Sequence, residues 1–425
     1  MTIVIAIIAL SVIIFVHELG HFLAAKAVGI KVLEFALFMG PKLFSFEKNG
    51  TVYSIRAIPI GGFVSMEGEE KEVESDTSYS GMPAYKKIIA VAAGPAANFI
   101  FAILLLFILF LSSGYTLDEN VVVNPRMAAY EAGIRDGDRI VSIDGRRIYD
   151  PLDLTILLYT NKGEPVEIVY VSDGEKITAS AMPEKKGGII HRINFIPEGE
   201  TNVVASIEQD SNGYLAGLRA GDVITAVNGE PVADRYEIDS VMKKFTGGML
   251  EVSALRNGVE MKFEFGAAVS EQPEYYDLGI YYKGSPTNIW TAFKHSVKYS
   301  VSTLRAVLLS IAWVVTGTVR FSEMMGPVGI VSTIGETIKQ ETFGMFMISL
   351  TGMMAFISLN LGLMNLIPFP ALDGSKIVIH SIEWIRKKPF PMEKTAWITI
   401  AGFILLLALL VFATYNDIAR LIGLG

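Results

Sequence analysis

One apolar segment at the start of the chain constrains the fold more than any other feature. Residues 3–16 contain no charged side chain, and the motif His17-Glu18-Leu19-Gly20-His21 follows directly. A helix from Thr2 to Lys26 would have about 25 residues and a length of roughly 37 Å, which is enough to cross a bilayer. The sequence therefore predicts a transmembrane helix that carries two histidines and a glutamate into the membrane.

This HExxH pattern is typical of a catalytic zinc site. On a helix, His17 and His21 lie one turn apart on the same face, and Glu18 can act as the general base. Ionisable groups at membrane depth cost several kcal/mol unless they are paired or bind a metal. We interpret His17 and His21 as zinc ligands. The metzincin extension is absent, since Ala24 and Ala27 stand where its glycine and third histidine should be, so a third ligand must come from elsewhere.

Apolar segments of sufficient length predict four transmembrane helices. They cover Thr2 to Lys26, Ile88 to Leu111, Phe346 to Ile367, and Ala396 to Thr414. The first could instead be a secretory signal peptide, but it has no basic region before its apolar core, and cleavage would discard the HExxH motif. We therefore expect it to be retained as a span.

Basic residues in the short loops predict the orientation. They lie between the first two spans (Lys31, Lys42, Lys48, Arg56, Lys71, Lys86 and Lys87) and between the last two (Lys376, Arg386, Lys387, Lys388 and Lys394). By the positive-inside rule both loops are cytoplasmic. Both termini and the long region between the second and third spans are then exterior, as expected for a multi-pass protein of the bacterial cytoplasmic (inner) membrane.

The composition fits a membrane protein that also has a soluble part. Hydrophobic residues make up 51% and charged residues 19%, and the mean hydropathy is +0.43. The net charge of −8 comes without a basic face, so we expect no nucleic-acid partner. The absence of cysteine excludes a disulfide framework and any cysteine-ligated metal.

The exterior region contains an internal repeat. Residues 132–140 match residues 216–224, and Asp144-Gly145 matches Asn228-Gly229, at one offset of 84 residues. Each copy resembles a PDZ domain, an α+β fold that binds extended peptides by strand addition and often captures a terminal carboxylate. A turn-rich scaffold without a ligand is the alternative. Neither copy has a Gly-Leu-Gly-Phe-like loop, so the peptide ligand cannot be named.

The best candidate for the third zinc ligand is Asp373, which follows Pro368 and Pro370 at the end of the third span. The two prolines break the helix at membrane depth, which is tolerated where backbone is buried in protein or lines a wet cavity. An aspartate that only caps a surface loop is the alternative. His380 is a rival ligand, which we rank lower because it lies beyond the loop among apolar residues.

Taken together, these motifs resemble the site-2 protease family of intramembrane zinc metalloproteases. The resemblance rests on HELGH at 17–21, Gly94-Pro95-Ala96-Ala97-Asn98-Phe99 in the second span, the tandem PDZ-like copies, and residues 365–374 in the third span. Order and spacing are similar to the bacterial RseP-type branch, the regulator of sigma-E protease type, over essentially the whole chain. One departure is Asp373-Gly374-Ser375 in place of the common Asp-Gly-Gly, which puts the local backbone geometry in doubt rather than the ligand.

The resemblance implies a set of roles. Zn2+ would be held by His17, His21 and Asp373, with Glu18 as the base. Residues 58–64 would form a membrane-associated β-hairpin whose edge pairs with an unwound substrate, which assigns Gly61, Gly62 and Phe63 to substrate positioning. Asn360 and Asn365 would hold the substrate backbone. The implied substrates are single-span membrane proteins, such as anti-sigma factors after a first exterior cut, or remnant signal peptides.

Several residues have more ordinary interpretations. Pro59 and the Gly61-Gly62 pair could form a plain cytoplasmic turn. Gly94 and Asn98 are four residues apart, and we favour helix packing over a direct catalytic role for them. Residues 288–319 read as a partly amphipathic helix that lies along the outer membrane surface or packs against the PDZ pair. We expect His191 and His295 to be surface residues.

The expected organisation is a polytopic α-helical membrane protein with four transmembrane helices, a membrane-associated β-hairpin and two exterior PDZ domains. The segments are a membrane part at 1–114, PDZ domains at 115–199 and 200–270, a linker with the interfacial helix at 271–345, and a second membrane part at 346–425. A non-catalytic PDZ scaffold with a structural zinc site is the alternative function. Glu18 favours the enzyme, because a structural site does not need this carboxylate. The PDZ pair would serve as a gate against substrates with bulky exterior domains, although recruitment is equally compatible with the sequence.

Overall fold

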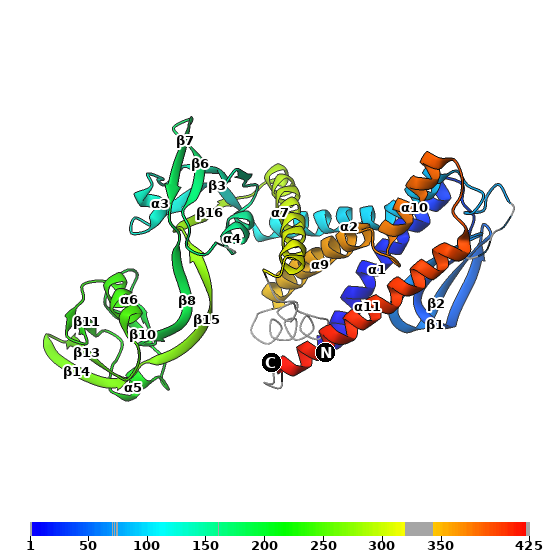
Figure 1. The fold of residues 1–425 in the computed structure, drawn as a ribbon. Helices are drawn as coiled ribbons and strands as arrows, with labels where there is room; N and C mark the ends of the chain where they lie inside the picture. The colour runs from blue at the N-terminus through cyan, green and yellow to red at the C-terminus, as the bar shows by residue number, and fades with distance from the viewer. Residues whose placement is uncertain are drawn as a thin grey trace.

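Long helices form one end of the protein and β-rich domains the other (Figure 1). A computed structural model describes residues 2–69, 71, 73, 75–159, 161–318 and 343–421. Within these residues five helices are long and apolar enough to cross a membrane. The chain is a multi-pass membrane protein. These helices are α1 (Thr2–Ala27), α2 (Ala84–Ser113), α7 (Ile289–Val315), α9 (Phe343–Leu366) and α11 (Met392–Leu421).

Small residues let α1, α2 and α9 approach closely. A Cβ added at Gly20 of α1 would overlap the carbonyl oxygen of Ala93 and lie 2.7 Å from the Cβ of Ala97, both on α2. On the opposite face of α2, a Cβ at Gly362 of α9 would lie 2.9 Å from the ring of Phe99. Close contact between helices in lipid depends on such positions, because the solvent supplies no hydrophobic driving force. The α1–α2 crossing lies within the HELGH motif itself.

The segment after α1 forms a bent hairpin of β1 (Val32–Lys48) and β2 (Thr51–Met66). Both strands bend, so residues 34–37 pair with 52–55 on one side and with 62–65 on the other. Positive φ angles at Phe38 (71°), Gly40 (86°) and Gly61 (78°) make these bends. The hairpin lies against α1, where the hydroxyl of Ser11 donates to the carbonyl of Pro59 at 3.2 Å. Among the described residues, the outer edge of 62–66 pairs with no strand.

The first β-rich domain has a four-stranded sheet of order β5-β4-β6-β7 and a separate pair, β3-β16. Its elements are β3 (Tyr115–Val123), α3 (Ala128–Glu131), β4 (Arg139–Ile143), β5 (Arg146–Arg147), α4 (Pro151–Tyr159), β6 (Val166–Ser172), β7 (Glu175–Ala181) and β16 (Ile280–Pro286).

The second β-rich domain repeats this order, with a sheet β12-β11-β13-β14 and a pair β10-β9. Its elements are β9 (Phe195–Pro197), β10 (Val204–Ile207), α5 (Asn212–Leu215), β11 (Val223–Val227), β12 (Glu230–Pro231), α6 (Arg235–Lys244), β13 (Met249–Arg256) and β14 (Val259–Gly266).

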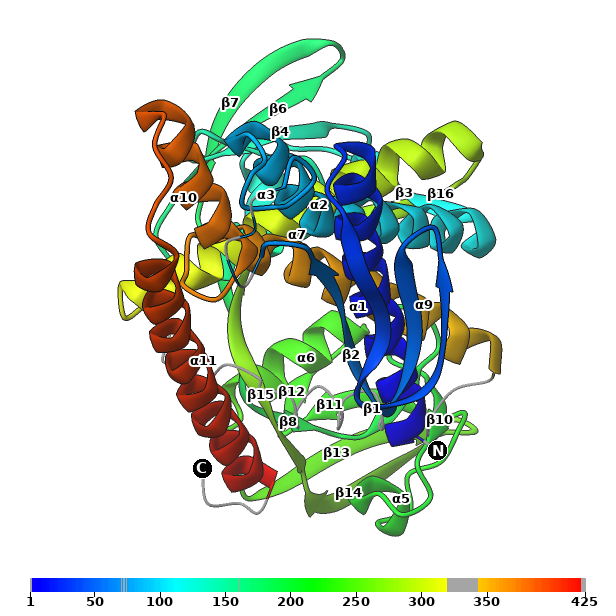
Figure 2. The same cartoon turned by 90° about the vertical axis from the view of Figure 1, so that its right-hand side faces the viewer.

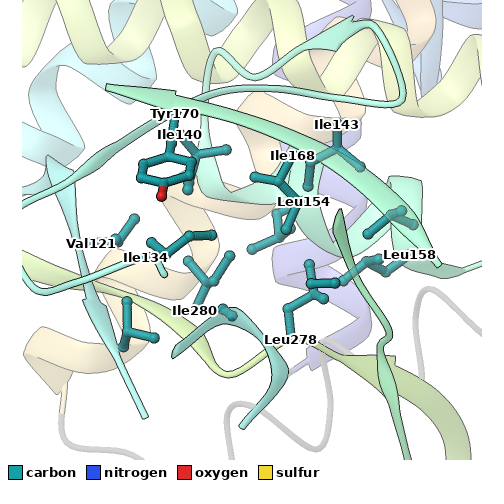
Figure 3. Close-up of a cluster of buried hydrophobic side chains, with 14 residues drawn as sticks. Val121, Ile134, Ile140, Ile143, Leu154, Leu158, Ile168, Tyr170, Leu278 and Ile280 are labelled. Atoms are coloured by element: carbon teal, nitrogen blue, oxygen red, sulfur yellow. The ribbon is translucent and has the colours of Figure 1, made fainter. Parts of the chain in front are cut away.

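The second domain is inserted into the first, so the expected boundaries at 115–199, 200–270 and 271–345 differ from the structure. An antiparallel ribbon of β8 (Glu184–Arg192) and β15 (Ala268–Asp277) leads out of the first domain and back again (Figures 1 and 2). Leu278 and Ile280, which follow the insertion, belong to the core of the first domain (Figure 3). Ile193 already belongs to the core of the second. The repeat marks the turn and strand that both domains share, but it cannot show that β16, which follows the insertion, pairs with β3 of the first domain.

Helix α7 joins the first domain to the membrane helices. Ser302 donates to Oδ2 of Asp153 on α4 at 2.8 Å, and Arg305 donates to the carbonyl of Arg147 at 2.6 Å. At its other end the ring of His295 lies 4.4 Å from that of Phe110 on α2. These contacts are with the first of the two domains, as in the interpretation that residues 288–319 pack against the domain pair. Residue 319 lies outside the described residues.

Two histidines expected at the surface are partly buried instead. The side chain of His295 is only 11% exposed, because it lies between α2 and the first domain. His191 is half-buried, and its ring contacts Phe245 with 5.3 Å between the ring centroids. The expectation is wrong for His295, because the tertiary fold covers it, whereas His191 keeps part of its surface exposed.

Candidate active site

Three predicted ligands meet between α1 and the start of α10 (Asp373–Arg386). Nε2 of His17 lies 3.2 Å from Nε2 of His21, and Oδ2 of Asp373 lies 3.1 and 3.3 Å from these two nitrogens. Both histidines are buried, and the side chain of Asp373 is 16% exposed. The structure thus brings together residues more than 350 positions apart in the sequence.

The three atoms of this triad form a set that suits a metal cation. Nδ1 of His21 lies 2.9 Å from the carbonyl oxygen of Ala90, so it carries the ring proton and leaves a lone pair on Nε2. Oδ2 of Asp373 has no hydrogen-bond donor among the described residues. Ligand atoms in a tetrahedral zinc site with bonds of about 2.0–2.1 Å lie roughly 3.3 Å apart, which agrees with the three distances here. The residues therefore fit zinc, with a fourth position left for water or substrate.

Asn98 of α2 holds the other imidazole. Its Nδ2 is placed 3.1 Å from Nδ1 of His17, while its Oδ1 is buried without a partner among the described residues. Exchanging the two amide atoms satisfies both groups, because Nδ1–H of His17 then donates to Oδ1. Ser358 of α9 in turn donates to the backbone carbonyl of Asn98 at 2.9 Å. The sequence favours helix packing over a direct catalytic role for Asn98, and its place in the motif at 94–99 does not show that the partner is His17.

Gly94 is required by the site itself. A Cβ at this position would overlap Nε2 of His21 and lie 2.9 Å from Cε1 of His17. The backbone of α2 therefore forms one wall of the ligand cluster. The sequence identified Gly94 as a close-contact position between helices, and the structure shows that the contacting groups are the imidazoles.

Glu18 lies close to the hairpin, and it directly follows His17 of the ligand cluster. A Cβ at Gly62 would lie 3.5 Å from Cγ of Glu18 and 2.9 Å from the carbonyl oxygen of Ala36, so the strand passes close to the carboxylate. Next to Gly62, the ring of Phe63 lies 4.8 Å from the guanidinium of Arg56. The strand at Gly62 thus passes close to the predicted base, whereas Gly61 lies against Met39. The assignment of Gly61, Gly62 and Phe63 to substrate positioning stays a prediction.

The turn before α10 sets the position of Asp373. Ala371 has a positive φ of 76°, an uncommon conformation for a residue with a Cβ. A Cβ at Gly374 would overlap the carbonyls of Leu366 and Ile367. The hydroxyl of Ser375 donates to the carbonyl of Leu372 at 2.8 Å, so the serine that departs from the family pattern closes this turn.

His380 does not reach the cluster. Its Nε2 lies 2.6 Å from the hydroxyl of Tyr79, and its Nδ1 lies 2.7 Å from Oε2 of Glu383. Both ring nitrogens are therefore engaged in a buried network that fastens α10 to the segment before α2. Nearer the site, Lys376 of α10 donates to Glu69 at 2.8 Å, which ties α10 to the end of the hairpin.

The structure gives no substrate contact for Asn360 or Asn365. Nδ2 of Asn360 donates to the carbonyl of Phe356 within α9 at 2.8 Å, and Asn365 stands at the end of the same helix. Their assignment to the substrate backbone stays a prediction.

Comparison with known proteins gives consistent results. The model of the family described as "Peptidase family M50" matches residues 5–409. The "Regulator of sigma-W protease RasP" of Bacillus subtilis is 30% identical, with 99% of each chain covered. The "Zinc metalloprotease RasP" of Bacillus licheniformis is 28% identical, again with 99% of each chain covered. A crystal structure of the HtrA3 PDZ domain bound to a phage-derived ligand is 21% identical and covers 21% of this chain and 90% of that one; its TM-score of 0.16 is too low to carry an argument.

Proposed function

Because the chain belongs to peptidase family M50, the site-2 protease family, we propose that this membrane zinc metalloprotease cleaves transmembrane segments of single-span proteins inside the bilayer. One observation supports this most strongly. His17 and His21 on α1, a helix long enough to cross a membrane, meet Asp373 of α10 close to Glu18 and to a strand whose outer edge pairs with no other described strand. A protease that acted on soluble peptides would have no need of this placement.

His17, His21 and Asp373 hold the zinc in this proposal. Zinc bound there supplies a Lewis acid that polarises the scissile carbonyl and lowers the pKa of water to about 7. Glu18 accepts the proton of the attacking water and passes it to the leaving amide nitrogen. Asn98 and the carbonyl of Ala90 hold the two imidazoles in the tautomer that presents Nε2 to the metal. Gly94 leaves the room that the two imidazole rings occupy.

The strand edge at 62–66 can bind a substrate whose transmembrane helix has unwound to expose a peptide bond. A transmembrane helix occupies its own carbonyls, and each backbone group left unpaired in lipid costs several kcal/mol. A substrate that unwinds next to Gly62 can pair with the edge as an added strand, which replaces the lost hydrogen bonds. Glycine at position 62 lets this strand lie close to Glu18, because a side chain there would contact both Ala36 and Glu18. Asn360 and Asn365 contribute backbone contacts on the opposite side in this proposal.

In this proposal four helices, α1, α2, α9 and α11, span the bacterial cytoplasmic membrane. Helix α7 then lies at the outer surface, because Ser302 and Arg305 in its second half bond to the first PDZ domain. Residues that bond to a domain outside the membrane cannot also lie in the hydrocarbon core. Both PDZ domains and both termini are exterior. The substrates are single-span proteins such as anti-sigma factors after an exterior cut, or remnant signal peptides.

We assign the PDZ pair the role of a gate against bulky exterior domains. The ribbon permits a specific test, since Arg192 and Ala268 are paired across it. Replacing residues 193–267 by an Asn-Gly turn removes the second domain and leaves the first complete. The gate predicts faster cleavage of untrimmed substrate by this variant. Unchanged or slower cleavage would instead favour recruitment.

The direct test of the proposed function uses purified full-length protein in detergent with a tagged single-span substrate. Glu18→Gln should abolish cleavage and keep zinc, while Asp373→Ala should lose both. Glu175→Gln, at an exposed position of β7, serves as the matched control and should cut at the parent rate. Cleavage by Glu18→Gln at the parent rate would refute the mechanism.

A further inference from the structure

A cavity of about 380 Å³ lies between the first PDZ domain and α7, away from the zinc site. Its lining comes from β3 and β4, from the segment that leads into α4, from β16 and from the first half of α7. The residues that matter here are Arg139, Asp150, Tyr282, Lys294, His295 and Lys298. The volume is within the range of about 300–1,000 Å³ that is typical of sites for small molecules.

Two residues that line this cavity each have a buried polar atom without a partner among the described residues. Asp150 is 4% exposed; its Oδ1 accepts from the backbone N–H of Leu152 at 3.1 Å, but its Oδ2 has no hydrogen-bond donor in the described part of the chain. Nδ1 of His295 is 3.7 Å from Oδ2, which is beyond hydrogen-bond distance. The hydroxyl of Tyr282 is also buried without a partner there. Buried polar groups are normally paired, so this pair indicates a ligand that donates hydrogen bonds.

The charges of the cavity indicate a ligand that carries both a positive and a negative group. Burial raises the pKa of Asp150 to about 6, so at neutral pH a mostly ionised carboxylate stands there without a hydrogen-bond donor for Oδ2. A primary ammonium group would supply the donor and the opposite charge. Arg139 of β4 and Lys294 and Lys298 of α7 also line the cavity, and their cationic side chains suit a phosphate.

The cavity lies close to the end of a membrane helix. The ring of His295 contacts Phe110, which lies three residues before the end of α2 at Ser113. Tyr299, one turn after His295, contacts the same Phe110 ring. The cavity is therefore level with the end of a transmembrane helix, where the lipid headgroups lie.

We propose that this cavity binds the headgroup of a phospholipid that carries a primary amine, of the phosphoethanolamine type. The ammonium group donates to Oδ2 of Asp150 and to the hydroxyl of Tyr282, and the phosphate faces Arg139, Lys294 and Lys298. A choline headgroup has no N–H to donate, and a glycerol headgroup has no positive charge for the carboxylate. The lipid would fill the joint through which α7 holds the first PDZ domain. The inference goes beyond the proposed function and does not depend on it.

The test measures lipid binding to delipidated full-length protein in detergent by native mass spectrometry. Phosphatidylethanolamine, phosphatidylcholine and phosphatidylglycerol with identical acyl chains are compared, together with free O-phosphoethanolamine. The amine lipid should bind roughly tenfold more tightly than the other two lipids, as expected for one charge-assisted hydrogen bond. Asp150→Asn should remove this preference, and Tyr282→Phe should reduce it. Asp173→Asn is the control, at an exposed turn residue whose positive φ of 49° suits asparagine.

Three results would overturn the proposal. Equal binding of the three lipids would show that the headgroup is not read. An unchanged preference in both Asp150→Asn and Tyr282→Phe would place lipid recognition elsewhere on the protein. Binding of free O-phosphoethanolamine as tight as that of the lipid would assign the cavity to a soluble compound rather than to the membrane.

Discussion

Substitution of Gly94 by alanine should remove zinc from the protein. The added Cβ would lie 2.5 Å from Cε1 of His21 and 2.9 Å from Cε1 of His17, against an ordinary separation of about 3.5–4.0 Å between carbon atoms. Each ring must therefore move by about 1 Å, whereas metal–ligand distances tolerate changes of roughly 0.2 Å. Loss of a group that only supports a ligand costs about 10- to 100-fold in metal affinity. Because Gly94→Ala displaces two ligands themselves, we expect a loss of more than about 100-fold.

The assay is competition for zinc against chelators of graded affinity, with metal content measured by mass spectrometry and cleavage measured in parallel. Overpacking should also lower the free energy of unfolding by roughly 1–3 kcal/mol. Gly352→Ala in α9 is the matched control, because its Cβ would meet only Cδ2 of Leu109 at 3.9 Å, an ordinary contact. Zinc affinity of Gly94→Ala within threefold of Gly352→Ala would refute the geometry of the site.

Other predictions follow from single contacts. Asn98→Ala should lower zinc affinity by about 10- to 100-fold, with Asn98→Asp, which keeps an acceptor for His17, less affected; equal losses in zinc titrations would contradict the tautomer argument. Asp373→Ala should lose zinc while His380→Ala keeps it, and the opposite zinc contents would make His380 the ligand. Because the pKa of Asp150 is about 6 in the folded protein and lower when unfolded, its ionisation destabilises the fold as the pH rises through 6. Asp150→Asn in lipid-free detergent should therefore gain roughly 1–3 kcal/mol at pH 7.5 and little at pH 4, as checked by Tm; an equal gain at both pH values would contradict this.

The parts of the fold that follow from local sequence were accessible before the structure. The four predicted spans coincide with four long helices, since runs of about 20 apolar residues have few alternatives. The fifth, α7, is less apolar and buries several serines against its neighbours, so its position depends on the first PDZ domain rather than on hydropathy. The same tertiary context buries His295.

The candidate site divides in a similar way. HELGH contains two of the proposed ligands and the proposed base within five residues, and the prolines before Asp373 indicated the third proposed ligand. Asn98 was missed because an asparagine on a membrane helix has many possible partners, and only the crossing of α1 and α2 at Gly20 aims it at His17. The insertion of one β-rich domain into the other depends on strand pairing across more than 150 residues, which no local pattern encodes.

The most direct test of the central claim is to map the bond that is cut. Full-length protein and a single-span substrate are placed in lipid bilayers, and the new termini are identified by mass spectrometry with and without zinc and in Glu18→Gln. We predict that the termini lie inside the apolar segment of the substrate, and that they disappear without zinc or without the Glu18 carboxylate. Termini confined to the polar flanks of the substrate, or cleavage inside the apolar segment that persists in Glu18→Gln, would contradict the account.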